Sequence, residues 1–377
     1  MLELDQANAL GALFARAGYS RVEPAVLQPV DVFLDLSGED IRRHMFVTQD
    51  ATGRELCLRP DYTIPVSRDY LASPGAGHQA AFSYLGPVFR LRAGTSGEFP
   101  QAGVESFGRG DQEAADAEIV ALALEALASL GIAHPVIRMG DVGLLTALLD
   151  KLELAPPVRR RVLRAVVQGR LESVLDGEDI NGRNGQDHAG LLAAIDGQDP
   201  QAARAFVEDV MAIAGVTSVG GRSAGEIAER FLARASSRNA RIDDEIRDIL
   251  KRYLAISGDP DAAIGQIRAL TREAGLDLDA ALDQCEARTG FMAARGLDVG
   301  SFVFAADFAR NLDYYTGLIF EAHDPGRPET KPIVGGGRYD GLLSHLGARE
   351  PIPAVGFAIW LDRLSAAPRP ITAGDRT

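Results

Sequence analysis

The stretch YLGPVFRLRAGTSGEFPQAGVESFG, residues 84–108, decides the fold. It contains two strand-like runs, Val88–Arg92 and Gly103–Phe107, whose close spacing is typical of an antiparallel meander and not of strand–helix–strand units. Gln101 and Glu105 lie four positions apart, so within a strand both side chains point to the same face. We therefore predict an antiparallel sheet that carries polar side chains on one face.

Elements on both sides of this stretch complete an α+β pattern. Apolar residues at helical spacing in 5–18 predict an opening helix that ends at Gly18. Asp111 and Asp141 are each placed to cap the start of a helix. The remaining predicted strands are 21–27, 54–58, 79–85, 136–139, 301–306, 317–323 and 354–359, and a last helix begins at Leu361.

The pattern of apolar, polar and glycine residues changes between residues 151 and 295. Helical periods alternate there with polar, glycine-rich breaks such as DGEDINGRNGQDHAG at 176–190. We predict an all-helical insertion between two parts of a strand-rich core. The expected domains are a first core part at 1–150, the insertion at 151–295 and a second core part at 296–377.

Composition and charge point to a soluble protein of the reducing cytoplasm. The formal net charge of −14 over 377 residues speaks weakly against binding to nucleic acid or anionic lipid. Cys57 and Cys285 are the only cysteines and stand far apart, so neither a disulfide framework nor a zinc knuckle is expected. The first residues lack a signal-peptide pattern, and no segment is apolar for long enough to span a membrane.

Four short segments concentrate charge and aromatic rings inside strand-like sequence. They supply carboxylates for an ammonium group, guanidinium groups for a carboxylate or phosphate, and phenols for a polar ring. This set suits a zwitterionic amino acid with a polar side chain. Solvent-exposed strand faces together with tyrosines buried in the core would give the same pattern. The segments are LRPDYTIP (58–65), YLGPVFRLR (84–92), PQAGVESFG (100–108) and ARNLDYYTG (309–317).

The triple glycine Gly335–Gly337 leaves two interpretations open. Such a run can cradle a phosphate, and it can equally allow two backbones to cross closely before a helix that starts at Tyr339. The sequence contains no nucleophile-elbow, P-loop or dinucleotide-binding motif, so no cofactor is expected. The six histidines have no ligand spacing, so no metal is expected either.

Taken in order along the chain, these segments resemble histidyl-tRNA synthetase, a class II aminoacyl-tRNA synthetase. RVEPAVLQP resembles the dimer strand of motif 1, YLGPVFR with PQAGVESFG resembles motif 2 and the segment after it, and PAVGFAIWLDRL resembles motif 3. GRELCLRPDYT, ARNLDYYTGLIFE and GGGRYDGLL resemble further signatures of that family. The resembling segments are 21–29, 53–63, 84–90, 100–108, 309–321, 335–343 and 353–364.

The resemblance implies a class II synthetase-like fold, with a six- or seven-stranded antiparallel sheet flanked by helices and a homodimer formed through the motif 1 strand. It assigns Arg90 and Arg363 to the phosphates of ATP. Asp61 stands where the synthetase has Glu, and Asn311 stands where it has Gly. The histidine-contacting positions that it implies are Asp61, Thr63, Gln101, Glu105, Arg310 and Tyr314, with Tyr315 beside them.

Three departures from the synthetase pattern concern tRNA and ATP. The chain ends at Thr377, soon after Arg363, where the synthetase continues with an anticodon-binding domain. The motif 2 loop is short and carries Arg92 where an adenine-contacting Glu is expected. In motif 3, Trp360 stands where a glycine leaves room for adenine, so an indole would fill that space.

This combination resembles the regulatory subunits of ATP phosphoribosyltransferase more closely than it resembles an active synthetase. The resemblance implies a non-catalytic subunit in the first step of histidine biosynthesis. It implies the short-form catalytic phosphoribosyltransferase as partner, histidine as a feedback ligand, and no tRNA. A divergent histidyl-tRNA synthetase and a stand-alone histidine sensor are the alternatives, because fold alone does not fix function.

Overall fold

A computed structural model describes most of the chain, which divides into two compact units. The first unit is Met1–Ala147 with Leu254–Thr377, and the second is Leu148–Tyr253. Within the described residues, no helix is both long enough and apolar enough to cross a bilayer. The described residues are 4–37, 39–92, 94, 96–167, 205, 209, 218–219, 222–223, 242–308, 314–326 and 331–364.

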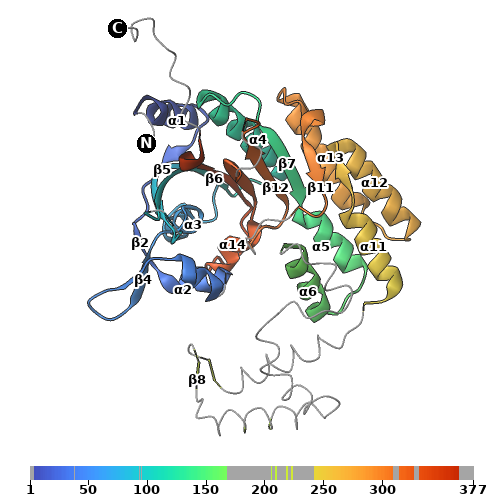
Figure 1. Ribbon diagram of the computed structural model, residues 1–377, viewed down its shortest axis with the longest axis horizontal. Helices are drawn as coiled ribbons and strands as arrows, with labels where there is room; N and C mark the ends of the chain where they lie inside the picture. The colour runs from blue at the N-terminus through green and yellow to red at the C-terminus, as the bar shows by residue number, and fades with distance from the viewer. Residues whose placement is uncertain are drawn as a thin grey trace, which may run out of the picture. The chain divides into compact units, whose positions relative to one another are not determined.

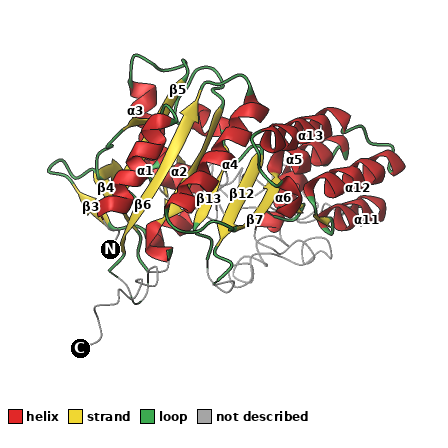
Figure 2. Ribbon diagram, turned by 90° about the horizontal axis from the view of Figure 1, so that it is seen from above, coloured by secondary structure: helices red, strands yellow, loops and turns green. Residues whose placement is uncertain are grey.

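A nine-stranded sheet forms the centre of the first unit (Figure 2). Its strands, in spatial order, are β1 (Ser20–Arg21), β5 (Ala80–Phe89), β6 (Glu98–Phe107), β14 (Ala354–Trp360), β13 (Val334–Arg338), β12 (Leu318–His323), β7 (Val136–Asp141), β11 (Val303–Ala305) and β10 (Ser257–Gly258). The six strands from β5 to β7 are antiparallel to their neighbours. At the two sides, β1 is parallel to β5 and β11 is parallel to β7.

The predicted α+β class with an antiparallel sheet is confirmed, with two differences. The parallel side strands β1 and β11, with β10 antiparallel to β11, extend the sheet beyond the six or seven strands that the resemblance implied. The runs predicted as separate strands at 79–85 and 88–92 form the single strand β5, which pairs with β6 along its whole length. Pro87 is tolerated inside it because β1 pairs with an earlier part of β5, so only one side of the strand has a strand partner there.

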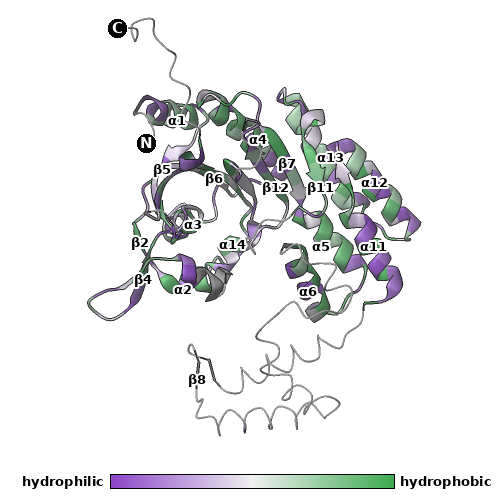
Figure 3. Cartoon of the chain, in the orientation of Figure 1, coloured by the Kyte–Doolittle hydropathy of each residue, from purple (hydrophilic) through white to green (hydrophobic). Residues whose placement is uncertain are grey.

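Helices cover both faces of this sheet (Figure 1). On one face α4 packs against β13, β14, α1 and α13, and on the other face α3 packs against α14. Figure 3 shows that α4 is predominantly hydrophobic, as expected for a helix enclosed between a sheet and other helices. The helices of this unit are α1 (Leu4–Arg16), α2 (Val30–Ser37), α3 (Thr63–Ala72), α4 (Gln112–Ser129), α5 (Val142–Lys151, which crosses the unit boundary), α12 (Pro260–Glu273), α13 (Asp279–Ala294) and α14 (Asp340–His345), with 3₁₀ turns η1 (Glu39–His44), η2 (Val299–Ser301) and η3 (Leu361–Arg363).

The two aspartates predicted to cap helices behave differently. The Leu144 amide donates a hydrogen bond to Asp141 Oδ1 at 3.0 Å, so Asp141 caps α5 as predicted. Asp111 occupies the N-cap position of α4, but its side chain makes no capping hydrogen bond. It instead pairs with Arg109 at 2.6 Å, because a guanidinium within reach competes for the carboxylate.

A separate antiparallel sheet of three strands lies beside α2. Its order is β2 (Leu27–Pro29), β4 (Glu55–Leu58) and β3 (Val47–Gln49), and Cys57 on β4 is fully buried. Six large apolar side chains are exposed in the described part of the chain, and four of them lie on this sheet or close to it. These four are Val26, Leu27, Val47 and Leu91, at 39–48% exposure. Leu27 pairs with Leu58 and Val47 pairs with Cys57, so the side chains of Leu27 and Val47 point to opposite faces of the sheet.

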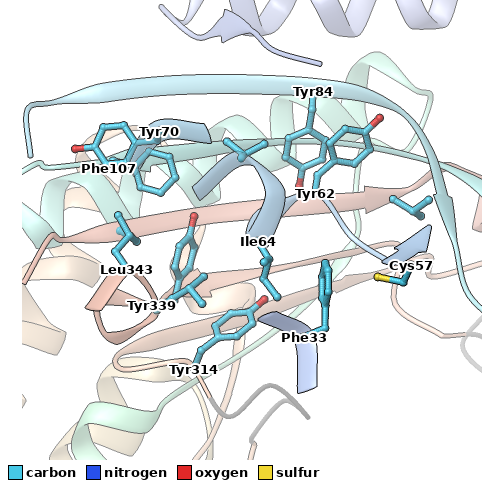
Figure 4. Packing of buried hydrophobic residues seen from close by; sticks show 14 of the residues in the cluster. Phe33, Cys57, Tyr62, Ile64, Tyr70, Tyr84, Phe107, Tyr314, Tyr339 and Leu343 are labelled. Atoms are coloured by element: carbon cyan, nitrogen blue, oxygen red, sulfur yellow. The ribbon is translucent and has the colours of Figure 1, made fainter. Parts of the chain in front are cut away.

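A hydrophobic cluster rich in tyrosine fills the space between this small sheet, α2, α3, α14 and the main sheet (Figure 4). Tyr62 stacks on Tyr84 with ring centres 4.4 Å apart, and Tyr70 stacks on Phe107 at 4.6 Å. Tyrosine buries its ring and keeps a hydroxyl available for a polar partner. The cluster can therefore surround a polar site and offer it hydroxyl groups.

Four charged side chains are buried together where α4, α13, β7 and β13 meet. Asp116 on α4 accepts hydrogen bonds from Arg288 Nε at 2.8 Å and from Arg338 Nη2 at 2.6 Å. Arg288 Nη1 also pairs with Asp141 Oδ2 at 2.6 Å. Burial raises the pKa of the Asp116 carboxyl, and the two guanidinium groups oppose that rise. We call these residues the buried ion network.

The described part of the second unit contains more than helices. It includes α6 (Pro156–Val167), α11 (Asp244–Leu254) and a short antiparallel pair, β8 (Ser218–Val219) with β9 (Arg222–Ser223). The prediction of an exclusively helical insertion is therefore corrected: the sequence between the two strands is Gly-Gly, which favours a tight hairpin turn. The predicted domain limits 1–150, 151–295 and 296–377 stay a prediction, but α12 and α13 are part of the first unit.

The triple glycine forms most of β13, between β12 and β14. A Cβ on Gly336 would lie 2.5 Å from the carbonyl oxygen of Gly356 and 2.7 Å from the Phe320 ring. Gly337 has φ +156°, and a Cβ there would overlap the Leu318 carbonyl oxygen. Of the two interpretations of this run, the close backbone crossing is the one that the geometry supports.

Candidate functional site

A hollow lies beside the start of α3, over strands β6, β13 and β14. Including the open solvent at its mouth, it encloses about 410 Å³ of space between the protein atoms. Its lining combines charged groups, aromatic rings and glycine backbone. The lining residues are Asp61, Thr63, Arg90, Gln101, Glu105, Tyr315, Gly335, Tyr339, Gly356, Phe357, Ala358 and Trp360.

The register of β6 and β14 places the polar side chains on the hollow. Gln101 is opposite Trp360 and Glu105 is opposite Gly356 in this antiparallel pair. Gln101 and Glu105 both line the hollow, so they share a face as their even spacing predicts. Gly356 leaves room for the carboxylate, because a Cβ there would overlap Glu105 Oε2 and the Val104 carbonyl oxygen.

Glu105 is almost fully buried, with 1% of its surface exposed, and three hydroxyl groups surround its carboxyl group. Thr63 Oγ1 donates to Oε1 at 2.7 Å, the Tyr84 hydroxyl donates to the same oxygen at 3.4 Å, and the Tyr339 hydroxyl donates to Oε2 through a short bond. Burial raises the pKa of Glu105 to about 8, although the hydroxyl donors lower it. Glu105 can therefore hold a proton near neutral pH and can also pair with a cation.

Asp61 and Arg90 form a charged wall of the hollow. Asp61 precedes α3, and its Oδ1 accepts a hydrogen bond from the Ile64 amide at 3.3 Å. Burial raises the pKa of Asp61, while Arg90 and the amide oppose this rise. Arg90 Nε donates to the Pro60 carbonyl oxygen at 2.7 Å, which holds the guanidinium beside the Asp61 loop.

Gln101 offers an acceptor for a ligand. Its side chain is 1% exposed, and its Oε1 has no hydrogen-bond partner among the described residues. Buried polar atoms in proteins normally have a partner. An acceptor of this kind, placed in the lining of a hollow, is suited to receive an N–H or O–H group from a bound molecule.

Trp360, the last residue of β14, lines the hollow. It is 6% exposed, and the Arg363 guanidinium lies 4.2 Å from the centre of its ring. Arg92 pairs with Asp362 at 3.1 Å, and its guanidinium lies 3.8 Å from the centre of the Phe99 ring. Stacked cations and an ion pair therefore hold the surroundings of Trp360 in place.

The structure brings most of the predicted site residues together. Two of the described ones are exceptions. Tyr314 packs in the tyrosine cluster, with its ring centre 5.7 Å from that of Tyr339, and does not line the hollow. Arg363 also lies outside the lining, against Trp360. Arg310 is outside the described residues. The predicted residues that line the hollow are Asp61, Thr63, Arg90, Gln101, Glu105 and Tyr315.

Tyr339 is a lining residue that the sequence reasoning missed. It follows β13 directly and reaches Glu105, which is 234 positions away in the chain. Its segment resembles a family signature, in which the triple glycine and not the tyrosine indicates binding. The signal available in the sequence was a lone tyrosine directly after a glycine-rich strand. Among the described residues, no group of three or more His, Cys, Asp or Glu side chains is placed to hold a metal ion.

Sequence comparisons identify the family. A sequence model of the histidyl-tRNA synthetase family matches residues 4–210 and 228–364. The ATP phosphoribosyltransferase regulatory subunit of Mesorhizobium japonicum is 40% identical over 359 residues, which cover 94% of this chain and 95% of the relative. The chain belongs to the family of ATP phosphoribosyltransferase regulatory subunits. Another member of this family, from Brucella anthropi, is 39% identical over 364 residues, covering 95% of both chains.

Solved structures agree on the fold of this regulatory-subunit family. An ATP phosphoribosyltransferase regulatory subunit/histidyl-tRNA synthetase from Bacillus halodurans matches with a TM-score of 0.67 at 22% identity, over 95% of this chain and 76% of that one. The histidyl-tRNA synthetase of Nostoc sp. PCC 7120 matches with a TM-score of 0.63 at 17% identity, over 96% and 70%. Both likenesses place the first unit in the class II synthetase fold.

Proposed function

We propose that this chain is a non-catalytic regulatory subunit of short-form ATP phosphoribosyltransferase, and that its hollow binds free histidine to mediate feedback on the first step of histidine biosynthesis. The observation that carries the proposal is a hollow with the groups to bind an amino acid, in which Trp360 is one of the lining residues. The partner follows from the relatives at 39–40% identity, which are named as regulatory subunits of that enzyme.

Histidine complements the groups that line the hollow. The carboxylate of Glu105 is placed to pair with its ammonium group, and Gln101 Oε1 can accept a hydrogen bond from a second N–H. The rings of Tyr315 and Tyr339 offer aromatic surface to the imidazole or to a cationic nitrogen. Arg310, outside the described residues, is proposed to bind the carboxylate of the ligand.

The surroundings of Trp360 argue against adenylate chemistry. Arg363, which the resemblance assigns to a phosphate, stacks on Trp360, and Arg92 pairs with Asp362. Formation of an adenylate needs ATP held in near-attack geometry beside the amino acid. We therefore expect no histidine-dependent exchange between ATP and pyrophosphate. Exchange above background would favour the alternative, a divergent histidyl-tRNA synthetase.

Calorimetric titration with histidine tests the ligand. Glu105→Ala should weaken binding more than tenfold, because loss of one partner of a buried charged contact costs about 2–5 kcal/mol. Tyr70→Phe is a matched control: its hydroxyl donates to the His78 carbonyl oxygen, and the residue does not line the hollow. The Tyr70→Phe variant should bind histidine with the same affinity as the wild-type protein. Absence of binding to the wild-type protein would reject the hollow as a histidine site.

Reconstitution with the catalytic subunit tests the regulatory role. Turnover of ATP with phosphoribosyl pyrophosphate should depend on this chain and should fall as histidine is added. A coupling of about 1–3 kcal/mol would change activity or affinity from severalfold to about a hundredfold. If turnover stays unchanged and gel filtration shows no complex, the chain is a stand-alone histidine sensor and the regulatory proposal fails.

We also propose that two copies of the chain associate through the small sheet. Leu27 of β2 supports this, because it is 48% exposed and lies in the segment that resembles the motif 1 dimer strand.

A further inference from the structure

The carboxyl group of Glu105 is held by hydroxyl groups from three separate elements. Thr63 stands at the start of α3, Tyr84 on β5, and Tyr339 directly after β13. A hydroxyl can donate to a carboxylate and can accept from a carboxylic acid, since it carries both a proton and lone pairs. These three hydroxyl groups can therefore hydrogen-bond to Glu105 in its ionised and in its protonated form, and they do not fix either form.

The groups that face Glu105 act on its pKa in both directions: the hydroxyl donors Tyr339, Thr63 and Tyr84 lower it, and Asp61 raises it. Asp61, before α3, adds a second acidic group on the same hollow and raises the pKa of Glu105. Arg90, directly after β5, lines the same wall, and its charge lowers the pKa of Asp61. From β14 the hollow is lined by uncharged residues, and from β6 by Gln101 beside Glu105 itself. The other titratable groups nearby are phenols: Tyr84, Tyr339, Tyr314 and Tyr315.

Burial has the largest effect on the pKa of Glu105, and it raises that pKa. A carboxylate that is withdrawn from water loses hydration, and hydroxyl donors restore only part of it. A cationic nitrogen that enters the hollow changes this balance, because an opposite charge within a few ångströms favours the ionised carboxylate. Aromatic rings of Tyr315 and Tyr339 line the same space and attract a cation as well.

We propose that the hollow takes up the cationic nitrogen of its ligand in exchange for the proton of Glu105, so that ligand binding releases a proton to solvent. The O–H bond of the Glu105 acid breaks, the proton leaves to water, and the carboxylate pairs with the ligand, which keeps its own protons. This inference rests on the proposed histidine site and adds a pH dependence to it.

The exchange fixes how affinity changes with pH. Because the pKa of Glu105 is about 8, the acid form dominates below that value and the ligand must displace its proton. The affinity for histidine should rise about tenfold for each pH unit from about pH 6.5 to about pH 8 and should level off above that. At pH 7, binding should release close to one proton for each histidine bound.

Calorimetry in two buffers measures the proton directly. Histidine is titrated into the full chain at pH 7 in phosphate and in Tris, whose ionisation enthalpies differ widely. The wild-type protein should give different heats in the two buffers. Glu105→Gln, which cannot ionise, should bind more weakly, with equal heats and with an affinity that no longer follows this pH curve.

Two tyrosine variants separate proton exchange from a structural effect. Tyr339→Phe removes a donor that lowers the pKa of Glu105, so the pH at which affinity levels off should move upward. Tyr70→Phe, whose hydroxyl bonds to His78 in the same cluster, should leave that pH unchanged. A purely structural role for Tyr339 would lower affinity equally at every pH and would overturn this part of the argument.

The outcomes distinguish this inference from the function on which it rests. Histidine binding with equal heats in both buffers would overturn the proton exchange and leave the histidine site intact. Absence of histidine binding at every pH would overturn both. Unequal heats that disappear in Glu105→Gln, together with the shifted pH curve of Tyr339→Phe, would establish the exchange.

Discussion

At the scale of single residues, Gly356 shows how the backbone makes room for a functional group. A methyl group at this position would overlap the Glu105 carboxylate and the Val104 carbonyl oxygen, and neither can move without breaking hydrogen bonds or strand pairing. We expect Gly356→Ala to lower the free energy of unfolding by about 1–3 kcal/mol, as overpacking does. It should also abolish histidine binding, measured by calorimetry.

Gly11 provides the matched control for that substitution. It lies within α1, and a Cβ there would meet no atom within 4 Å. Gly11→Ala should raise the free energy of unfolding by about 0.5–1 kcal/mol, because alanine favours the helix and restricts the unfolded chain. Equal effects of the two substitutions would show that the space beside Glu105 is not what requires a glycine.

Glu105 also makes stability depend on pH. Its pKa is about 8 in the folded protein and near 4.5 in the unfolded chain, so between these values the folded state binds more protons. Stability therefore falls as pH rises through this window. Relative to Glu105→Gln, the free energy of unfolding of the wild-type protein should fall by at most about 5 kcal/mol from pH 4.5 to pH 8, measured by urea denaturation.

Glu55 gives a control of opposite sign. Arg42 lowers the pKa of this exposed carboxyl, so the stabilisation from the pair is lost as pH falls. Relative to Glu55→Gln, the wild-type protein should become slightly less stable toward acid. If the comparison for Glu105 shows the same direction as that for Glu55, the carboxyl of Glu105 is not the proton-binding group that its burial implies.

At the scale of elements, the buried ion network joins two helices to two strands. Asp116 of α4 is the shared partner of Arg288 on α13 and Arg338 on β13. Asp116→Ala would remove one carboxylate partner from each of two buried guanidinium groups, leaving Arg288 with Asp141 and Arg338 with Asp340. We expect a loss of about 3–5 kcal/mol in the free energy of unfolding, measured by chemical denaturation.

The ion pairs of Arg268 provide the comparison for that network. Arg268 on α12 pairs with Asp279, Asp283 and Glu286, whose side chains are about half exposed or more. Arg268→Ala should cost about 1 kcal/mol or less, because water and salt screen exposed charges. A cost as large as that of Asp116→Ala would contradict the view that burial makes the difference.

At the scale of the whole molecule, the small sheet, at Leu27, is the surface that we expect to hold two copies together. Leu27→Glu should shift the protein toward monomers in sedimentation velocity, because a charge in an apolar interface loses its hydration. Phe291→Glu is the matched control, since Phe291 is 46% exposed, close to the 48% of Leu27, but lies on α13. Two variants with the same sedimentation behaviour would rule out the small sheet as the interface.

The sequence by itself determined the elements and much of the hollow. The helix of residues 5–18, the Asp141 cap and the shared face of Gln101 and Glu105 follow from local geometry, because helices and strands have fixed periods. The family signatures likewise follow from short, collinear segments that can be read without a fold. Such features depend on residues a few positions apart.

Only the tertiary structure decided what surrounds those residues. The bond from Tyr339 to Glu105, the space that Gly356 leaves, and the pairing of Asp116 with Arg288 all join segments more than a hundred residues apart in the chain. The raised pKa of Glu105 depends on burial by side chains from several strands at once. No local pattern encodes these properties, because burial is the combined effect of many distant side chains that meet only in the folded chain.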